Sequence, residues 1–144
     1  MSSQAAQALA NGSSKKGLYC LTICGFRKPG MSEEDFKEYM TNTHGRISKD
    51  LLAKYGMVRW TLSFQTTESR KAMASLYGPQ FNKVAEYDFF SQSFFDDLDV
   101  VVRMQQDPYY KEFIQNDHDN FADGQKTRVT IGFSEDYIVG GKAI

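Results

Sequence analysis

Four segments of the chain have the patterns of apolar and aromatic residues that predict β-strands. They are residues 18–26, 57–65, 86–91 and 127–137. The first segment is apolar on both alternating faces, so we expect a strand that is covered on both sides. The second has one apolar and one polar face, and its polar face suits the wall of a wet cavity.

Apolar residues recur at helical spacing between the first two predicted strands. Ser32 precedes a run of acidic residues and is expected to cap a helix that extends to about Thr43. His44-Gly45 interrupts the pattern, and residues 47–55 then restore a helical stripe. We therefore expect two helical segments separated by a break at His44.

The second half of the chain predicts a loop followed by helices. Residues 66–83 have mixed polarity and contain Gly78-Pro79, so we expect a loop with room for one helical turn. A helix is expected from Ser93, and Asp107-Pro108 is expected to start another that ends near residues 117–123.

This order of elements, β-α-β-β-α-β, predicts an α+β protein with the ferredoxin-like arrangement, in which helices cover one face of an antiparallel sheet. The other face needs cover as well, because the first strand is apolar on both sides and soluble monomers rarely expose large apolar patches. We therefore expect a homodimer that packs sheet against sheet as an α+β barrel. A pocket between helix and sheet, or inside the barrel, is the expected small-molecule site.

A chain of 144 residues is the size of one domain. We expect a flexible tail over residues 1–16, a single domain over residues 17–138 and a short C-terminal tail over residues 139–144. Cys20 and Cys24 lie on one predicted strand, about 13 Å apart and beyond disulfide reach. Reduced cysteines and the absence of a secretory signal favour a cytoplasmic protein.

Charge and motifs exclude several classes of partner. The 17 basic and 18 acidic residues leave a formal net charge of −1, so the basic surface of a nucleic-acid-binding protein is absent. No run of about 18 apolar residues occurs, so we expect no membrane-spanning helix. Nucleotide-binding glycine motifs and paired metal-ligand motifs are absent too, and we expect neither a cofactor nor a bound metal.

Only two histidines occur, so acid–base chemistry near neutral pH falls first to them. His44 is the better candidate, because it lies at the break between two predicted helices and precedes a glycine that lets a ligand approach the backbone. The alternative is that His44 caps the carbonyl groups at a helix C-terminus. His118 lies among solvent-loving residues, which favours a surface or packing role, but it stays a candidate for substrate binding.

Asp88 is a carboxylate in an otherwise apolar strand, so it must be paired or have a raised pKa. It is therefore a candidate catalytic residue. The alternatives are a structural ion pair with Arg59 and a place at the wet edge of the strand. Other polar side chains are candidates for binding a substrate oxygen or carboxylate. They are Tyr19, Tyr39, Tyr87, Arg59 and Ser63.

Several short motifs occur in an order that resembles the EthD domain. The segment from Arg27-Lys28-Pro29-Gly30 to Thr43-His44-Gly45 resembles that family's Pro-Gly turn, acidic helix start and helix-ending His-Gly. Later motifs resemble the fungal subgroup associated with aromatic polyketide pathways. They are Tyr87-Asp88, Asp107-Pro108-Tyr109-Tyr110-Lys111, residues 117–123 and Thr130-Ile131-Gly132. The resemblance covers about residues 18–138.

The resemblance implies a dimeric α+β barrel and a cofactor-free tailoring enzyme that decarboxylates or dehydrates an intermediate of aromatic polyketide biosynthesis. It carries the family's histidine over to His44. Asp88 and His118 match motifs of the fungal subgroup. The expected substrate is accordingly a small aromatic polyketide.

Three functions stay open at this point. A decarboxylase of a β-keto acid would use His44 to donate or shuttle a proton, Asp88 to orient His44, and Tyr39 or Tyr87 to assist at the substrate oxygen. A dehydratase or cyclase would use His44 to take an α-proton. A noncatalytic dimer would only bind an aromatic ligand.

Overall fold

The computed structural model describes residues 17–78 and 83–144, and the predicted N-terminal tail lies outside them. The main sheet consists of strands β1 (Leu18–Gly25), β2 (Arg59–Phe64), β3 (Phe89–Phe95) and β4 (Arg128–Ser134). The helices are α2 (Glu33–Tyr39), α3 (Gly45–Lys54), α4 (Thr67–Tyr77) and α5 (Asp99–Gln106). Shorter helical segments are the π-helices η1 (Met40–His44) and η2 (Tyr110–Ile114) and the 3₁₀-helix η3 (Asp117–Asn120).

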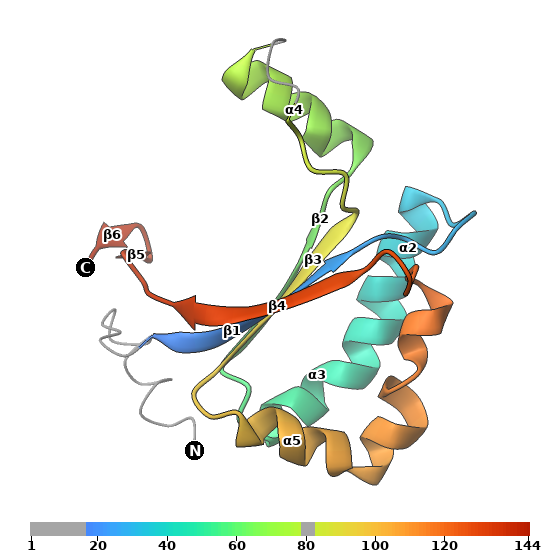
Figure 1. Cartoon of the computed structure of the whole chain (residues 1–144), viewed down its shortest axis with the longest axis vertical. Coiled ribbons are helices and arrows are strands. Elements are labelled where there is room, and N and C mark those ends of the chain that lie inside the picture. Colours follow the sequence, from blue (N-terminus) through green and yellow to red (C-terminus); the bar gives the residue numbers. More distant parts are fainter. Residues whose placement is uncertain (1–16, 79–82) are drawn as a thin grey trace.

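Helices α2, α3 and α5 lie on one side of the sheet (Figure 1). The strand order is β2-β3-β1-β4, and every strand runs antiparallel to its neighbours. This is the ferredoxin-like arrangement, so the predicted α+β class is confirmed. Helix α4 stands apart from the other helices, and none of its residues is buried. Within the described residues, no helix has both the length and the apolar character that crossing a bilayer requires.

Two clusters of buried side chains join the helices to the sheet. The first consists of Phe36, Met40, Phe89 and Phe121. The second consists of Leu51, Leu52, Met104 and Ile114. The apolar face of β2 contacts both, through Leu62 and Phe64 in the first and Trp60 in the second. The helical segment that carries His44 is therefore packed against the sheet on either side of that residue.

The break predicted at His44-Gly45 is a widened turn within a continuous helix. Ser32 begins α2 as predicted, and its hydroxyl accepts a hydrogen bond from the N–H of Asp35 at 3.0 Å. In η1 the N–H of Gly45 donates to the carbonyl of Met40, five residues earlier, and the chain continues into α3 with helical torsion angles. Because the helix continues from His44 into α3, the alternative that His44 caps a helix C-terminus is wrong.

Helix α4 forms where the sequence predicts a loop. Its first turn is closed by Thr66 and Ser69, whose side chains each accept a hydrogen bond from the other's backbone N–H. The loop prediction is therefore wrong. The helix buries no residue, and the apolar periodicity that reveals most helices is accordingly weak here.

Strand β3 extends further than the sequence predicts, and α5 begins later, at Asp99. The residues of β3 that face the core are Phe89, Ser91, Ser93 and Phe95. Two of these four buried positions are serines, so the alternation of apolar and polar residues is lost in the middle of the strand. The predicted helix start at Ser93 is wrong for this reason.

The predicted C-terminal tail contains a small hairpin. Strand β4 ends at Ser134, earlier than predicted, and β5 (Ile138–Val139) pairs with β6 (Lys142–Ala143). Gly140 and Gly141 form the turn with φ angles of 61° and 79°, a conformation that favours glycine.

The sheet face away from the helices is more polar than the first strand predicts. Its central row crosses all four strands in register and consists of Thr61, Gln92, Thr22 and Thr130. Exposed apolar side chains lie instead along the edge strand β4, where Val129, Ile131 and Phe133 are 61%, 50% and 76% exposed. The apolar surface that needs cover therefore includes the edge of the sheet.

Candidate active site

His44 and Asp117 are 73 residues apart in the chain and share a hydrogen bond in the fold. His44 ends η1, and Asp117 begins η3. The Nδ1 atom of His44 lies 2.8 Å from Oδ2 of Asp117. Only 15% of the His44 side chain and 6% of the Asp117 side chain are exposed, so the pair is largely removed from water.

Asp117 accepts two further hydrogen bonds at its other oxygen. The hydroxyl of Tyr39 donates at 2.5 Å, and the side-chain amide of Asn120 donates at 3.1 Å. Burial acts to raise the pKa of Asp117, but hydrogen bonds from Tyr39, His44 and Asn120 outweigh it and hold the pKa below its usual value. The carboxyl group is therefore ionised at neutral pH. Burial and the bond to Asp117 raise the pKa of Tyr39 to about 12, so the phenol stays protonated.

His44 is a neutral imidazole with a defined tautomer. Burial lowers the pKa of His44 and outweighs the opposing effect of Asp117. An ionised carboxylate only accepts hydrogen bonds, so Nδ1 carries the proton and Nε2 carries a lone pair. The rings of Phe121 and Trp60 flank the imidazole at centroid distances of 4.7 and 5.8 Å. Nε2 makes no hydrogen bond within the part of the chain that the structure describes, which leaves it available as a base.

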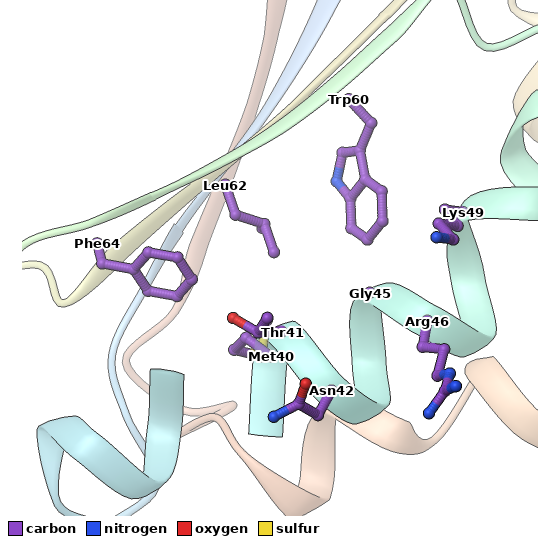
Figure 2. Close-up of a pocket in the computed structure, with 9 residues that line it drawn as sticks. All are labelled: Met40, Thr41, Asn42, Gly45, Arg46, Lys49, Trp60, Leu62 and Phe64. Carbon is purple, nitrogen blue, oxygen red and sulfur yellow. The ribbon is translucent and has the colours of Figure 1, made fainter. Parts of the chain in front are cut away.

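A cavity of about 550 Å³ lies between the helical segment η1–α3 and strand β2. It is lined by Met40, Thr41, Asn42, Gly45, Arg46, Lys49, Trp60, Leu62 and Phe64. In Figure 2, Trp60, Leu62 and Phe64 point from β2 toward the helix. Trp60 joins the cavity to the His44 site, because it lines the one and packs edge-on against the imidazole of the other. The volume and the apolar wall suit a small aromatic molecule.

The structure brings two of the predicted site residues together. His44 and Tyr39 are both bonded to the carboxylate of Asp117. Tyr39 therefore reaches the site through Asp117, and its hydroxyl is already engaged there.

Asp88 does not meet His44. One of its oxygens accepts a hydrogen bond from the backbone N–H of Arg27 at 2.8 Å. The other lies 3.5 Å from Nε of Arg27 and 3.4 Å from the guanidinium of Arg70. Asp88 thus forms structural ion pairs, as one of the alternatives predicted, but its partners are Arg27 and Arg70 and not Arg59. The place beside His44 that the sequence assigns to Asp88 is held by Asp117.

Arg59 and Ser63 lie on the polar face of β2, away from the cavity. Both are exposed, and they alternate with the residues of β2 that point toward the helices. Arg59 stacks over the ring of Phe94, and Ser63 accepts a hydrogen bond from Gln65. Neither contacts the His44–Asp117 pair.

Tyr19 on β1 and Tyr87, which precedes β3, pack in aromatic groups elsewhere in the fold. The ring of Tyr19 contacts those of Phe95 and Phe133, and the ring of Tyr87 contacts those of Phe26 and Phe90. Neither residue lines the cavity described above.

His118 is exposed at the surface of η3. Its Nε2 lies 3.2 Å from the carboxylate of Asp119, and its Nδ1 lies 3.1 Å from the carbonyl of Gln115. Although Asp117 is adjacent in sequence, no three His, Cys, Asp or Glu side chains in the described ranges are placed to hold a metal ion.

Sequence reasoning missed three residues of the site, which are Asp117, Asn120 and Trp60. Asp117 and Asn120 lie three residues apart, so one helical turn brings both to the same point. The phenylalanine at position 121 is the available signal, because an apolar residue after a polar run indicates that one face of this turn is buried. The distance of 73 residues between His44 and Asp117 hides their pairing in a single sequence.

The fold and the site define a ferredoxin-like α+β domain that holds a buried His–Asp pair beside an aromatic cavity. The chain belongs to the EthD domain family, whose model matches residues 28–125. This confirms the resemblance drawn from the sequence motifs.

Fungal proteins are similar to this chain over most of its length. Decarboxylase claH of Passalora fulva is 41% identical over 97% of this chain and 92% of its own length. Decarboxylase dmxR15 of Cryptosporiopsis sp. is 45% identical over 91% of this chain and 90% of its own length. The conidial pigment biosynthesis dehydratase EthD of Metarhizium robertsii is 40% identical over 88% and 89%, respectively.

Solved structures share the fold at low sequence identity. An EthD family protein from Bacillus halodurans has a TM-score of 0.54 and 13% identity, over 82% of this chain and 99% of its own. A DABB family protein with a ferredoxin-like fold from Mesorhizobium loti has a TM-score of 0.50 and 15% identity, over 84% and 100%. These similarities concern the fold alone.

Proposed function

We propose that this protein is a cofactor-free lyase that removes carbon dioxide from a β-keto acid in aromatic polyketide biosynthesis. The observation that carries the proposal is the buried His44–Asp117 pair, with Nε2 of His44 available as a base beside an aromatic cavity. The names of the relatives from Passalora fulva and Cryptosporiopsis, both decarboxylases, support the same reaction.

In this reaction, Nε2 of His44 accepts the proton of the substrate's carboxyl group. The bond between the carboxyl carbon and the α-carbon breaks, carbon dioxide leaves, and the electron pair stays on the substrate as an enolate. The imidazolium returns its proton to the α-carbon, so the products are carbon dioxide and a ketone, and His44 is restored. Asp117 stabilises the imidazolium and fixes the tautomer, and Tyr39 holds Asp117, so both are positioning residues.

The same pair also suits loss of water, which is the second candidate. Nε2 of His44 takes an α-proton, the bond from carbon to the leaving hydroxyl breaks, and the imidazolium protonates that hydroxyl as water. The names of two relatives favour this reaction, the dehydratase of Metarhizium robertsii and dehydratase aurZ of Gibberella zeae.

The mass of the product distinguishes these reactions. Purified protein is incubated with candidate aromatic β-keto acids, and the products are analysed by mass spectrometry. Loss of carbon dioxide supports the proposal, and loss of water alone supports the dehydratase. Tight binding with the ligand unchanged supports a noncatalytic binding protein. Activity is expected to survive chelation, and revival of a chelated sample by one particular metal would contradict a cofactor-free mechanism.

Substitution of each histidine tests which one carries the proton. His44→Ala is expected to lower turnover by about 10²- to 10⁴-fold, because Nε2 is the base. His118→Ala is the matched control, and it should change turnover little because that ring is exposed and lies outside the site. A His44→Ala protein that stays folded and fully active would remove the histidine from the mechanism.

We also propose that the protein is a cytoplasmic homodimer. A second copy would cover the apolar side chains that β4 exposes, including Ile131 and Phe133, and would give α4 a surface to pack against. Cys20 and Cys24 are both free, which fits a reducing compartment.

A further inference from the structure

Two basic side chains belong to the cavity, and neither takes part in the mechanism above. Arg46 and Lys49 lie three residues apart on α3, so they project from neighbouring positions of one helix surface. Both are exposed, whereas the aromatic wall on β2 is half-buried, so the two cations form part of the rim. In Figure 2 they stand at the Trp60 end of the cavity, with the guanidinium of Arg46 turned outward from β2.

Neither cation is neutralised within the described part of the chain. Some other basic side chains there form ion pairs, for example Lys54 with Asp107 and Arg103 with Asp99. Arg46 has a carboxylate four residues ahead of it on the same helix, at Asp50, and yet makes no ion pair with it. Two neighbouring positive charges repel each other, and an anion bound between them would offset that repulsion.

We propose that Arg46 and Lys49 bind the carboxylate of the substrate at the rim of the cavity, with its aromatic part against Trp60 and Leu62. The inference rests on the proposed function and assigns the residues that hold the ionised carboxylate of its substrate. Both side chains are long and flexible, so their charged ends can meet one carboxylate from adjacent turns of the helix. The apolar wall supplies the area that a flat ring buries.

The role of the two cations is capture of the substrate and not cleavage of its bond. The acid is ionised when it arrives at the rim, and its carboxylate takes up a proton from solvent there before it moves inward to the apolar surroundings of His44, which accepts that proton in the reaction. An ion pair at the rim stabilises the bound substrate but is absent when the carbon–carbon bond breaks, so its loss raises KM without lowering kcat. The product lacks the carboxylate, so it leaves the rim without breaking an ion pair.

A pair of unreactive probes tests the binding site directly. 2-Naphthoate and 2-naphthamide have the same ring, and only the first is charged at neutral pH. We expect the wild-type protein to bind naphthoate about tenfold more tightly than naphthamide, measured by isothermal titration calorimetry at low salt. Trp60 is the only tryptophan of the chain, so quenching of its fluorescence shows that the probe occupies this cavity.

The double variant Arg46→Gln, Lys49→Gln is expected to lose this discrimination and to bind both probes like naphthamide. The matched control is Lys71→Gln, Lys111→Gln, which removes the same net charge from exposed positions elsewhere and should keep the tenfold preference. Equal binding of the two probes by wild type, or an unchanged preference in the Arg46/Lys49 variant, would overturn the proposal.

Turnover separates this inference from the proposed reaction. If the protein decarboxylates a β-keto acid, the Arg46/Lys49 variant should raise KM about tenfold and leave kcat unchanged or higher. A fall in kcat with unchanged KM would contradict the capture role while leaving the decarboxylase in place. If no acid is turned over but naphthoate is preferred through these two residues, the anion site stands and the proposed reaction fails.

Discussion

At the scale of single residues, the site depends on how one carboxylate is shared. Asp117 receives a hydrogen bond from Tyr39, one from Asn120 and one from His44, and it remains ionised although it is buried. That charge keeps the proton of His44 on Nδ1 and so leaves Nε2 as a lone-pair base. The chemistry of His44 therefore depends on a residue that never needs to touch the substrate.

Asp117→Asn removes the charge and keeps the size of the side chain. We expect turnover to fall by about 10²-fold or more, because the imidazolium loses its counter-charge and the tautomer is no longer fixed. Asp119→Asn is the control, since the same change falls two residues away on a side chain that is 75% exposed. Turnover and melting temperature are measured on both proteins, and equal turnover would contradict a positioning role for Asp117.

The pH dependence of activity should report the lowered pKa of His44. The base form is required, so kcat/KM is expected to be constant at neutral pH and to fall as the pH drops through a pKa below the ordinary 6.5. The unfolded chain binds this proton more readily than the folded one, so stability should also decline as the pH drops below 6.5. An acid limb centred at or above pH 7 would show that another group is being titrated.

At the scale of elements, the turn that carries His44 differs from the helix break that the sequence pattern predicts. The sequence indicates correctly that the helix is disturbed at His44-Gly45, but a broken apolar stripe does not distinguish a helix end from an inserted residue. The π-turn η1 adds that residue and lets the helix continue, which directs His44 toward Asp117. Helix α4 and the centre of β3 escape prediction because the first buries no residue and the second buries serines.

Gly45→Ala tests whether the π-turn is needed. In an ordinary helix this change stabilises the protein by about 1 kcal/mol, but a Cβ at Gly45 would lie 2.9 Å from the carbonyl oxygen of Met40, so the turn must shift. We therefore expect lower stability and at least tenfold lower turnover, because His44 moves with the turn. Gly124→Ala meets no atom within 4 Å and is the control. A more stable and fully active Gly45→Ala protein would contradict the requirement for glycine.

At the scale of the whole molecule, the sequence predicts the sheet and its helical layer better than it predicts the surface. Strand order and helix placement follow from the succession of elements, and that succession is visible in the periodicity. Which side chains meet depends on register and on contacts distant in sequence, so His44 and Tyr39 are predictable as candidates and Asp117 as their partner is not. The exposed apolar side chains of the main sheet are also hard to place from the sequence. They lie on β4 and not on the face of β1 that points away from the helices.

The position of the exposed apolar side chains on β4 makes the expected dimer testable with one substitution. Phe133 is 76% exposed on the edge strand, so Phe133→Asp should leave the core of the chain intact while placing a charge on a surface that a second copy would bury. We expect a dimer mass for the wild-type protein by light scattering at micromolar concentration, and a monomer mass for Phe133→Asp. Phe113→Asp is the control, because it makes the same change on a 49% exposed ring of the helical layer and should stay dimeric. A wild-type monomer would refute the dimer, and a dimeric Phe133→Asp protein with native melting behaviour would show that β4 is not the surface that joins the two copies.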